Sequence, residues 1–235
     1  MKNKKLIGLV GGLGPMAGND VLRKLFEYSA SRYKAVHDNE YPNVLLISEG
    51  LADFDETGHI SPQFEKDILS VVDLLEVHNP TVMGIACNTA HVFAQKIQGH
   101  TDATFINIVE ATVQEASKQQ GRYLILSSST TRKTGLYHKE LENQHVDYLD
   151  VNDDEQITVD KIIGLVMASK LHEADKLAGD LIAKVSIKYP SATGIIAGCT
   201  ELPLALNHTK MRDKFTVIDC NTCLAKALAD AYYSI

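Results

Sequence analysis

Short apolar runs, rich in β-branched residues, recur along this chain and alternate with stretches of helical period. Seven of these runs have the length and composition of strands, and they cover residues 6–10, 43–48, 82–86, 104–108, 123–127, 194–197 and 215–219. Helical spacing of apolar residues marks 160–167 and 171–185, and Ser61 followed by Pro62 predicts the start of a further helix. The strands are apolar throughout rather than at every second residue, which is typical of parallel strands covered on both faces. The pattern therefore predicts an α/β fold with parallel sheets flanked by helices.

Composition limits the class of protein. The 235 residues are 45% hydrophobic and 23% charged, ordinary values for a globular chain that can bury one large core or two smaller ones. The net charge of −7, with acids and bases interspersed, argues against nucleic-acid binding. No apolar run approaches the ~20 residues of a membrane-spanning helix, and a first buried strand explains the N-terminus better than a signal peptide does. Four cysteines do not suggest a disulfide framework, so we expect a reducing, cytoplasmic location.

Two cysteines, Cys87 and Cys199, lie in closely matching contexts, one in each half of the sequence. Each ends a short apolar run and precedes hydroxyl or amide side chains, Asn88 and Thr89 in the first segment and Thr200 in the second. The pattern predicts strand, tight turn and helix, which would place each thiol at a helix N-terminus and lower its pKa. A lone cysteine of this kind is more often a buried structural thiol, but the polar neighbours would form a cradle for an anion.

The repetition predicts a duplicated half. We expect a first half made of residues 1–110 plus 205–235, with Cys87, and a second half made of residues 111–204, with Cys199. The last strand and helix would then return to the first half. In each half the cysteine would stand at the carboxyl end of a strand, the edge at which open α/β sheets bind ligands.

A glycine-rich loop at residues 11–15 follows the first predicted strand and opens a helix, with Pro15 at its first position. Read from Gly12, it also matches the dinucleotide-binding fingerprint G-x-G-x-x-A. In that motif a ribose-binding acid follows about 20 residues on, whereas the second strand here ends at Glu49, which is too late. We therefore expect the Gly12 loop to offer its backbone N–H groups to a small carboxylate.

Two further polar segments each allow two interpretations. Residues 127–135 follow a predicted strand and offer hydroxyl donors, with Thr131 and Thr134 best placed, although an ordinary turn with a helix cap explains them equally well. Cys220 and Cys223 form a single C-x-x-C pair, without the second pair that would complete a zinc site. We interpret these two cysteines as packing residues at the start of a helix rather than as a redox motif.

Three motifs together resemble the signatures of the aspartate/glutamate racemase family, in the family's order and spacing. They are Gly-Leu-Val-Gly-Gly-Leu-Gly-Pro at 8–15, Ala-Cys-Asn-Thr-Ala-His at 86–91 and Gly-Cys-Thr-Glu-Leu-Pro at 198–203. The resemblance runs along the whole chain. It implies two pseudo-symmetric α/β halves with the site in the cleft between them, no cofactor and no metal, and commonly a homodimer.

The resemblance also implies a mechanism with two bases acting on a small-molecule amino acid or related carboxylate. Cys87 and Cys199 would be the catalytic pair, one removing the α-proton as thiolate and the other delivering a proton to the opposite face. Beside the Gly12 loop, the implied contacts to the substrate's carboxylate and amine are Asn88, Thr89, Thr131 and Thr200. Glu201 is implied as a supporting partner. His91 either tunes the Cys87 thiol or is a packed or capping histidine.

Two departures leave the substrate's side chain open. Aspartate-selective members of the family carry an arginine in the loop after the second strand, but no Lys or Arg occurs here between residues 35 and 65, and the loop at 49–60 is acidic. The helix predicted at 158–168 also lacks the lysine that the family usually carries near its end, and the nearest lysine is Lys170. Either Arg132 or Lys133 substitutes as the clamp for a distal carboxylate, or the substrate has a neutral or amine side chain.

Two other function classes remain open at this point. One is a related reaction on the same fold, by a hydantoin-type racemase, a decarboxylase or an isomerase. The other is a non-catalytic protein that binds a small acid, which the missing cationic clamp favours. Retention of both cysteines favours two-sided proton transfer over the single-cysteine protonation that follows a decarboxylation.

Overall fold

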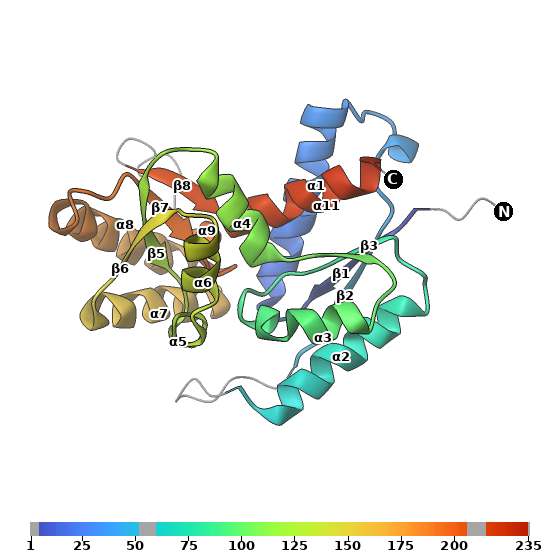
Figure 1. Cartoon of the computed structure of the whole chain (residues 1–235), viewed down its shortest axis with the longest axis horizontal. Helices are drawn as coiled ribbons and strands as arrows, with labels where there is room; N and C mark the ends of the chain where they lie inside the picture. Colours follow the sequence, from blue (N-terminus) through green and yellow to red (C-terminus); the bar gives the residue numbers. More distant parts are fainter. Residues whose placement is uncertain (1–4, 52–59, 206–214, 235) are drawn as a thin grey trace. The chain divides into compact units, whose positions relative to one another are not determined.

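The computed structural model describes residues 5–51, 60–205 and 215–234. The chain forms two compact units (Figure 1): one consists of Met1–Ile108 together with Asn221–Ile235, and the other of Val109–Cys220. Each unit contains one four-stranded, fully parallel sheet. The α/β class predicted from the apolar strand pattern is confirmed.

The sheet of the first unit has the order β2-β1-β3-β4. Its strands are β1 (Ile7–Gly11), β2 (Val44–Ser48), β3 (Val82–Ile85) and β4 (Thr104–Ile106). The helices of this unit are α1 (Pro15–Tyr33), α2 (Pro62–Glu76), α3 (Ala94–Gly99) and α11 (Cys220–Ser234), with short 3-10 helices η1 (Asp38–Glu40) and η2 (Thr89–Phe93). The predicted cap of α2 forms, because the Ser61 side chain accepts a hydrogen bond from the Phe64 N–H at 3.1 Å.

Helices cover both faces of the first sheet (Figure 1). Against one face packs a buried cluster that includes Val10, Met83 and Ile85 from the strands and Phe64, Ile68 and Val72 from α2. On the other face, a Cβ at Gly84 would lie 3.2 Å from Leu224 and 3.1 Å from Leu228, so α11 packs directly on the backbone of β3. The absence of a side chain at Gly84 lets this helix approach the sheet closely.

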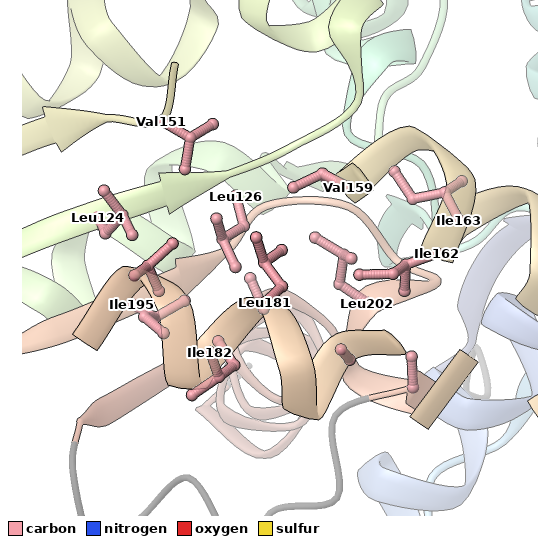
Figure 2. Packing of buried hydrophobic residues seen from close by; sticks show 14 of the residues in the cluster. Leu124, Leu126, Val151, Val159, Ile162, Ile163, Leu181, Ile182, Ile195 and Leu202 are labelled. Atoms are coloured by element: carbon pink, nitrogen blue, oxygen red, sulfur yellow. The ribbon is translucent and has the colours of Figure 1, made fainter. Parts of the chain in front are cut away.

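The sheet of the second unit has the order β6-β5-β7-β8. Its strands are β5 (Arg122–Leu126), β6 (Asp147–Asp150), β7 (Gly194–Ala197) and β8 (Thr216–Asp219). The helices are α4 (Ile108–Ser117), α5 (Ser129–Thr134), α6 (Leu136–Asn143), α7 (Asp153–Met167), α8 (Leu171–Lys188) and α9 (Leu202–Ala205). Figure 2 shows the core of this unit, in which side chains of β5 and β7 meet those of α7, α8 and α9.

A buried acid ties the first turn of α7 to the end of α8. Glu155 is fully buried and forms a capping box with Asn152, each side chain accepting from the other's backbone N–H at 3.0 Å. Lys188 Nζ and the Tyr189 hydroxyl donate to the Glu155 carboxylate at 2.9 and 2.7 Å. Burial alone would raise the pKa of Glu155, but these hydrogen bonds outweigh it and lower the pKa. The network fixes where α7 begins.

The two sheets repeat each other strand by strand. Val82 pairs with Thr104 in the first sheet, and Gly194 pairs with Thr216 in the second. Each residue of the second pair follows its counterpart in the first by the same number of residues that separates Cys199 from Cys87. Thr81 and Thr193 are related by the same offset. The Thr81 hydroxyl accepts a hydrogen bond from the Leu6 N–H, just before β1, at 3.2 Å. The Thr193 hydroxyl accepts one from the Arg122 N–H, at the start of β5, at 3.0 Å. The duplicated half predicted from the cysteine contexts is therefore present down to single hydrogen bonds.

The structure differs from the sequence prediction at three points. All seven predicted strands form, but β6 was not predicted. The divisions between the units fall after residues 108 and 220, rather than near 110 and 205. As a result α11 joins the first unit, whereas β8 stays with the second. β8 is held there because the Thr216 N–H donates to Thr193 O at 3.1 Å and the strand continues in register with β7.

Among the described residues, none of the helices combines the length and apolar character needed to cross a lipid bilayer.

Candidate functional site

The candidate residues stand at the switch points of the two sheets. Strand order reverses between β1 and β3 in one sheet and between β5 and β7 in the other, and open α/β sheets bind ligands at the carboxyl ends of such strands. Cys87 follows β3 and Cys199 follows β7. The residue before each cysteine donates its N–H to the neighbouring strand, Ala86 to Val10 O at 2.9 Å and Gly198 to Leu126 O at 2.7 Å. Both cysteines therefore leave their sheets at equivalent points.

His91 holds the loop of Cys87 through the backbone. Its Nδ1 lies 2.7 Å from the Cys87 carbonyl oxygen, and its Nε2 accepts from the Ile108 N–H at 3.2 Å. One nitrogen must donate and the other must accept, so the ring is neutral with its proton on Nδ1. Burial lowers the pKa of His91 to about 4, although the hydrogen bond to the Cys87 carbonyl opposes this. The ring also stacks on Phe105, so the structure places His91 as a capping and packing residue.

Asn88 and Thr89 follow Cys87 at the start of η2, a 3-10 helix of five residues. The Asn88 carbonyl accepts from the His91 N–H at 3.1 Å, which closes the first turn. Both residues are buried and take part in interactions, and Cys87 itself is 8% exposed. The predicted helix after Cys87 therefore begins as a 3-10 helix and continues directly into α3.

The Gly12 loop requires glycine for steric reasons. Gly12 has a φ of +85°, and a Cβ there would lie 2.1 Å from the Glu49 carbonyl oxygen. The loop thus packs on the backbone of the residue that follows β2. α1 then begins at Pro15, as predicted. Asp53, Asp55 and Glu56 of the acidic loop lie outside the described residues.

The loop after β5 forms a capped turn. Ser128 is the N-cap of α5: its hydroxyl accepts from the Thr131 N–H at 3.2 Å and lies 3.0 Å from the Thr131 hydroxyl. Thr131 is buried, and the Thr134 hydroxyl donates to the Thr131 carbonyl at 2.6 Å. Of the two threonines singled out from the sequence, Thr131 therefore takes part in the N-cap, whereas Thr134 bonds to the backbone at the other end of α5.

Two side chains that the sequence analysis did not single out anchor this loop from α7. Gln156 Nε2 donates to the Ser127 carbonyl at 2.8 Å and to Asp160 Oδ1 at 3.2 Å. The Asp160 carboxylate also accepts from the Ser129 N–H at 2.9 Å and from the Ser129 hydroxyl. Apart from the Gln156–Asp160 bond within α7, these contacts join residues far apart in the sequence, so no local motif signals them.

Cys199 has a carboxylate as its neighbour. Its half-buried thiol donates to Glu201 Oε2 at 3.0 Å, and the Thr200 hydroxyl donates to the same oxygen at 3.1 Å. Burial, together with the charge and hydrogen bond of Glu201, raises the pKa of the Cys199 thiol well above its ordinary value. Burial also raises the pKa of Glu201, against the hydrogen bonds from Cys199 and Thr200. The predicted lowering of the thiol pKa is therefore wrong for Cys199.

Cys220 and Cys223 are buried in the first turn of α11, and all four cysteines are free thiols. Within the described ranges, no group of three or more His, Cys, Asp or Glu side chains is arranged to hold a metal ion. The candidate residues divide between the two units: Gly12, Cys87, Asn88, Thr89 and His91 belong to the first, and Thr131, Cys199, Thr200 and Glu201 to the second.

Comparison with known proteins places the chain in a family. It is 24% identical over 227 residues to the broad specificity amino-acid racemase RacX of Bacillus subtilis (strain 168), covering 97% of this chain and 98% of that protein. Its fold is similar to that of the Picrophilus torridus aspartate racemase, with a TM-score of 0.81 at 24% identity over 97% of this chain and 94% of that one. An aspartate racemase homologue from Pyrococcus horikoshii OT3 gives a TM-score of 0.78 at 24% identity, over 98% and 99% of the two chains. The sequence model of the Asp/Glu/Hydantoin racemase family matches residues 10–228, and the protein belongs to this family of isomerases.

Proposed function

We propose that the protein is an amino-acid racemase that works without a cofactor and uses Cys87 and Cys199 as its two proton-transfer groups. The observation that carries the proposal is the equivalent position of the two thiols, each at the switch point of one of two identically ordered sheets. Membership of the racemase family supports the reaction class. The curated relative from Bacillus subtilis, named an amino-acid racemase, supports the substrate class.

The proposed reaction moves one proton off the α-carbon and another onto it. A thiolate on one face breaks the Cα–H bond and becomes a thiol, and the electron pair delocalises into the substrate carboxylate. A thiol on the opposite face then donates its proton to the α-carbon and becomes a thiolate, which inverts the centre. Hydrogen-bond donors near the carboxylate stabilise the charge that develops on it. We assign this role to the Gly12 loop, Asn88, Thr89, Thr131 and Thr200.

The two thiols enter this scheme in different states. The raised pKa of Cys199 supports a neutral thiol there, ready to donate a proton, so that Cys87 acts first as the base. In the reverse direction Cys199 must lose its proton. Glu201, whose Oε2 is 3.0 Å from the sulfur, is placed to accept it.

The substrate that we propose has no distal carboxylate. No Lys or Arg occurs between residues 35 and 65, the region that holds the loop after β2, and this loop is acidic. A dicarboxylate would be repelled by such a loop, whereas a neutral or amine side chain would not. We also propose a homodimer in a reducing cytoplasm, and sedimentation velocity of the purified chain tests the oligomeric state.

Proton exchange in deuterium oxide tests the proposal. Single enantiomers of a panel of amino acids, including aspartate and glutamate, are incubated with the protein without added cofactor, and NMR follows the α-proton. We expect exchange together with loss of optical purity for at least one neutral or basic amino acid. A complete lack of exchange across the panel contradicts the proposal, and exchange confined to aspartate and glutamate contradicts the assignment of the substrate.

Single cysteine variants separate the two-base mechanism from its alternatives. Cys87→Ser and Cys199→Ser should each lose racemisation, while each retains α-proton exchange with the one enantiomer that faces its remaining thiol. Cys223→Ala, which removes a buried cysteine from α11, is the matched control and should racemise normally. Racemisation that survives the loss of either Cys87 or Cys199 contradicts the mechanism. Release of carbon dioxide from the substrate would identify a decarboxylase instead.

A further inference from the structure

A hollow of about 470 Å³ opens between α5 and the first turn of α7 in the second unit. Its lining residues are Ser129, Arg132 and Lys133 from α5, and Asp153, Gln156 and Ile157 from α7. The volume lies within the range of roughly 300–1,000 Å³ that is typical of small-ligand pockets. The hollow also lies where β5 and β6 end, at the carboxyl edge of the sheet.

This hollow, which we call the α5/α7 pocket, uses a different face of α5 from Thr131. Positions 129, 132 and 133 are spaced i, i+3 and i+4 and share one face of the helix. Thr131 points to the other side, where it is buried against its cap. A ligand in the pocket therefore does not occupy the position of a substrate held by Thr131. The same geometry argues against Arg132 or Lys133 as a substitute clamp for that substrate.

Arg132 is poorly paired for a largely covered arginine. Its side chain is 29% exposed, and its ion-pair partner among the described residues is Asp153, 3.5 Å away and itself 98% exposed. A guanidinium has five N–H donors in a planar fork that matches a carboxylate. One long contact to a solvent-exposed acid leaves most of this fork available to a ligand.

The lining fits a singly charged, partly apolar ligand. Arg132 offers one guanidinium to a carboxylate, and Asp153 would repel a dianion more than a monoanion. Ile157 adds an apolar surface that is 68% exposed. A short aliphatic monocarboxylate satisfies both features, with its carboxylate on Arg132 and its chain on Ile157.

Hydrogen bonds connect the pocket to the loop that carries Thr131. Gln156, which lines the pocket, holds the Ser127 carbonyl at 2.8 Å, directly before the Ser128 cap. Ser129, which also lines the pocket, is held through its N–H and hydroxyl by Asp160. A ligand that changes the packing of α5 against α7 changes this network as well.

We propose that the α5/α7 pocket is a second binding site, which takes a short aliphatic monocarboxylate on Arg132 and couples its occupancy to the Thr131 loop through Gln156 and Asp160. The site is distinct from the proposed racemase site. Its binding does not depend on turnover, so that the two proposals can fail separately.

Methyl NMR of the full chain, labelled at isoleucine δ1 methyl groups, tests the binding. Butyrate is the probe, and butanamide is its uncharged analogue. We expect a saturable shift of the Ile157 methyl with butyrate and none with butanamide, while the methyl of Ile187, 82% exposed on α8, stays unchanged. Arg132→Gln should weaken binding about tenfold or more, because it removes a charge-assisted bidentate contact.

Arg122→Gln is the matched control, because Arg122 is a half-exposed arginine with a distant aspartate partner at 3.7 Å, at the opposite end of β5. It should leave binding unchanged. Equal losses in the two arginine variants, or no saturable shift at Ile157, overturn the site. Amide exchange in residues 128–131 should slow with butyrate in the wild type but not in Asp160→Asn, and butyrate binding without this slowing overturns the coupling.

Discussion

Acidification probes the way His91 holds the loop of Cys87. The ring is 3% exposed, and its two nitrogens are bound to the Cys87 carbonyl and the Ile108 N–H. A protonated ring would lose the second contact, because Nε2 would then carry a hydrogen where it now accepts one. The folded protein must therefore keep His91 neutral at pH values at which the unfolded chain protonates it.

The loss of stability on acidification follows from the pKa values of His91 in the unfolded and folded states. His91 has an ordinary value of 6.5 and a folded value of about 4, set by burial. The unfolded state binds more protons between these values, so the free energy of unfolding falls as the pH falls. From roughly pH 8 to pH 5 this one residue should remove about 2 kcal/mol of stability, out of about 3 kcal/mol for the whole shift.

Urea unfolding at a series of pH values measures this effect. His91→Asn keeps a donor near the Cys87 carbonyl and cannot titrate, so its unfolding free energy should fall about 2 kcal/mol less than that of the wild type over the same range. His172→Gln replaces an exposed histidine and should follow the wild type. Carboxylates that titrate in the same range are common to all three proteins and cancel in the comparison.

Two results would refute the reasoning. One is equal pH dependence of the unfolding free energy in His91→Asn and the wild type. The other comes from NMR of the imidazole in the wild type and does not depend on the variant's folding. A ring that titrates near its ordinary value, or that carries its proton on Nε2, is incompatible with the two hydrogen bonds.

Three further variants test other parts of the structure. Glu155→Gln weakens the hydrogen bonds from the half-exposed Lys188 and from Tyr189, and urea unfolding should show a loss of about 1–3 kcal/mol at neutral pH. In the wild type this contribution should be lost as the pH falls below 4.5 through the lowered folded pKa. Gly12→Ala would clash with backbone and should destabilise the fold by more than about 1 kcal/mol, whereas Gly99→Ala, with open space around it, should stay within about 0.5 kcal/mol. Glu201→Gln removes the charge beside Cys199 and should speed its alkylation by iodoacetamide at a fixed pH, followed by mass spectrometry of the Cys199 peptide.

The strands were predictable because burial on both faces leaves a continuous apolar run. β6 escaped this rule because it is an edge strand that begins and ends with aspartate and is only partly buried. β8 was found in the sequence but assigned to the wrong half. Which sheet a strand joins depends on pairing with residues far away in the chain, and nothing in so short a run encodes its partner.

The positions of the two cysteines were predictable, but their electrostatics were not. Strand-to-turn patterns are local, so Cys87 and Cys199 could be placed at the ends of strands from their neighbours alone. The pKa of Cys199 depends instead on burial and on the contact with Glu201, which both raise it. The anchoring of the Thr131 loop by Asp160 likewise depends on tertiary packing.

The internal repeat gives the two cysteines the same scaffold and different chemical partners. The offset along the chain that relates Cys87 to Cys199 also relates Thr89 to Glu201, so the carboxylate occurs at one of two equivalent positions. Backbone geometry is thus repeated, while the group that controls the proton on sulfur is not. Under the proposed mechanism a turnover must start with one thiolate and one thiol, and two equivalent sites would have no reason to differ. A single residue of the repeat, Glu201 in place of a threonine, supplies that difference, because its carboxylate adds to the raised pKa of the Cys199 thiol.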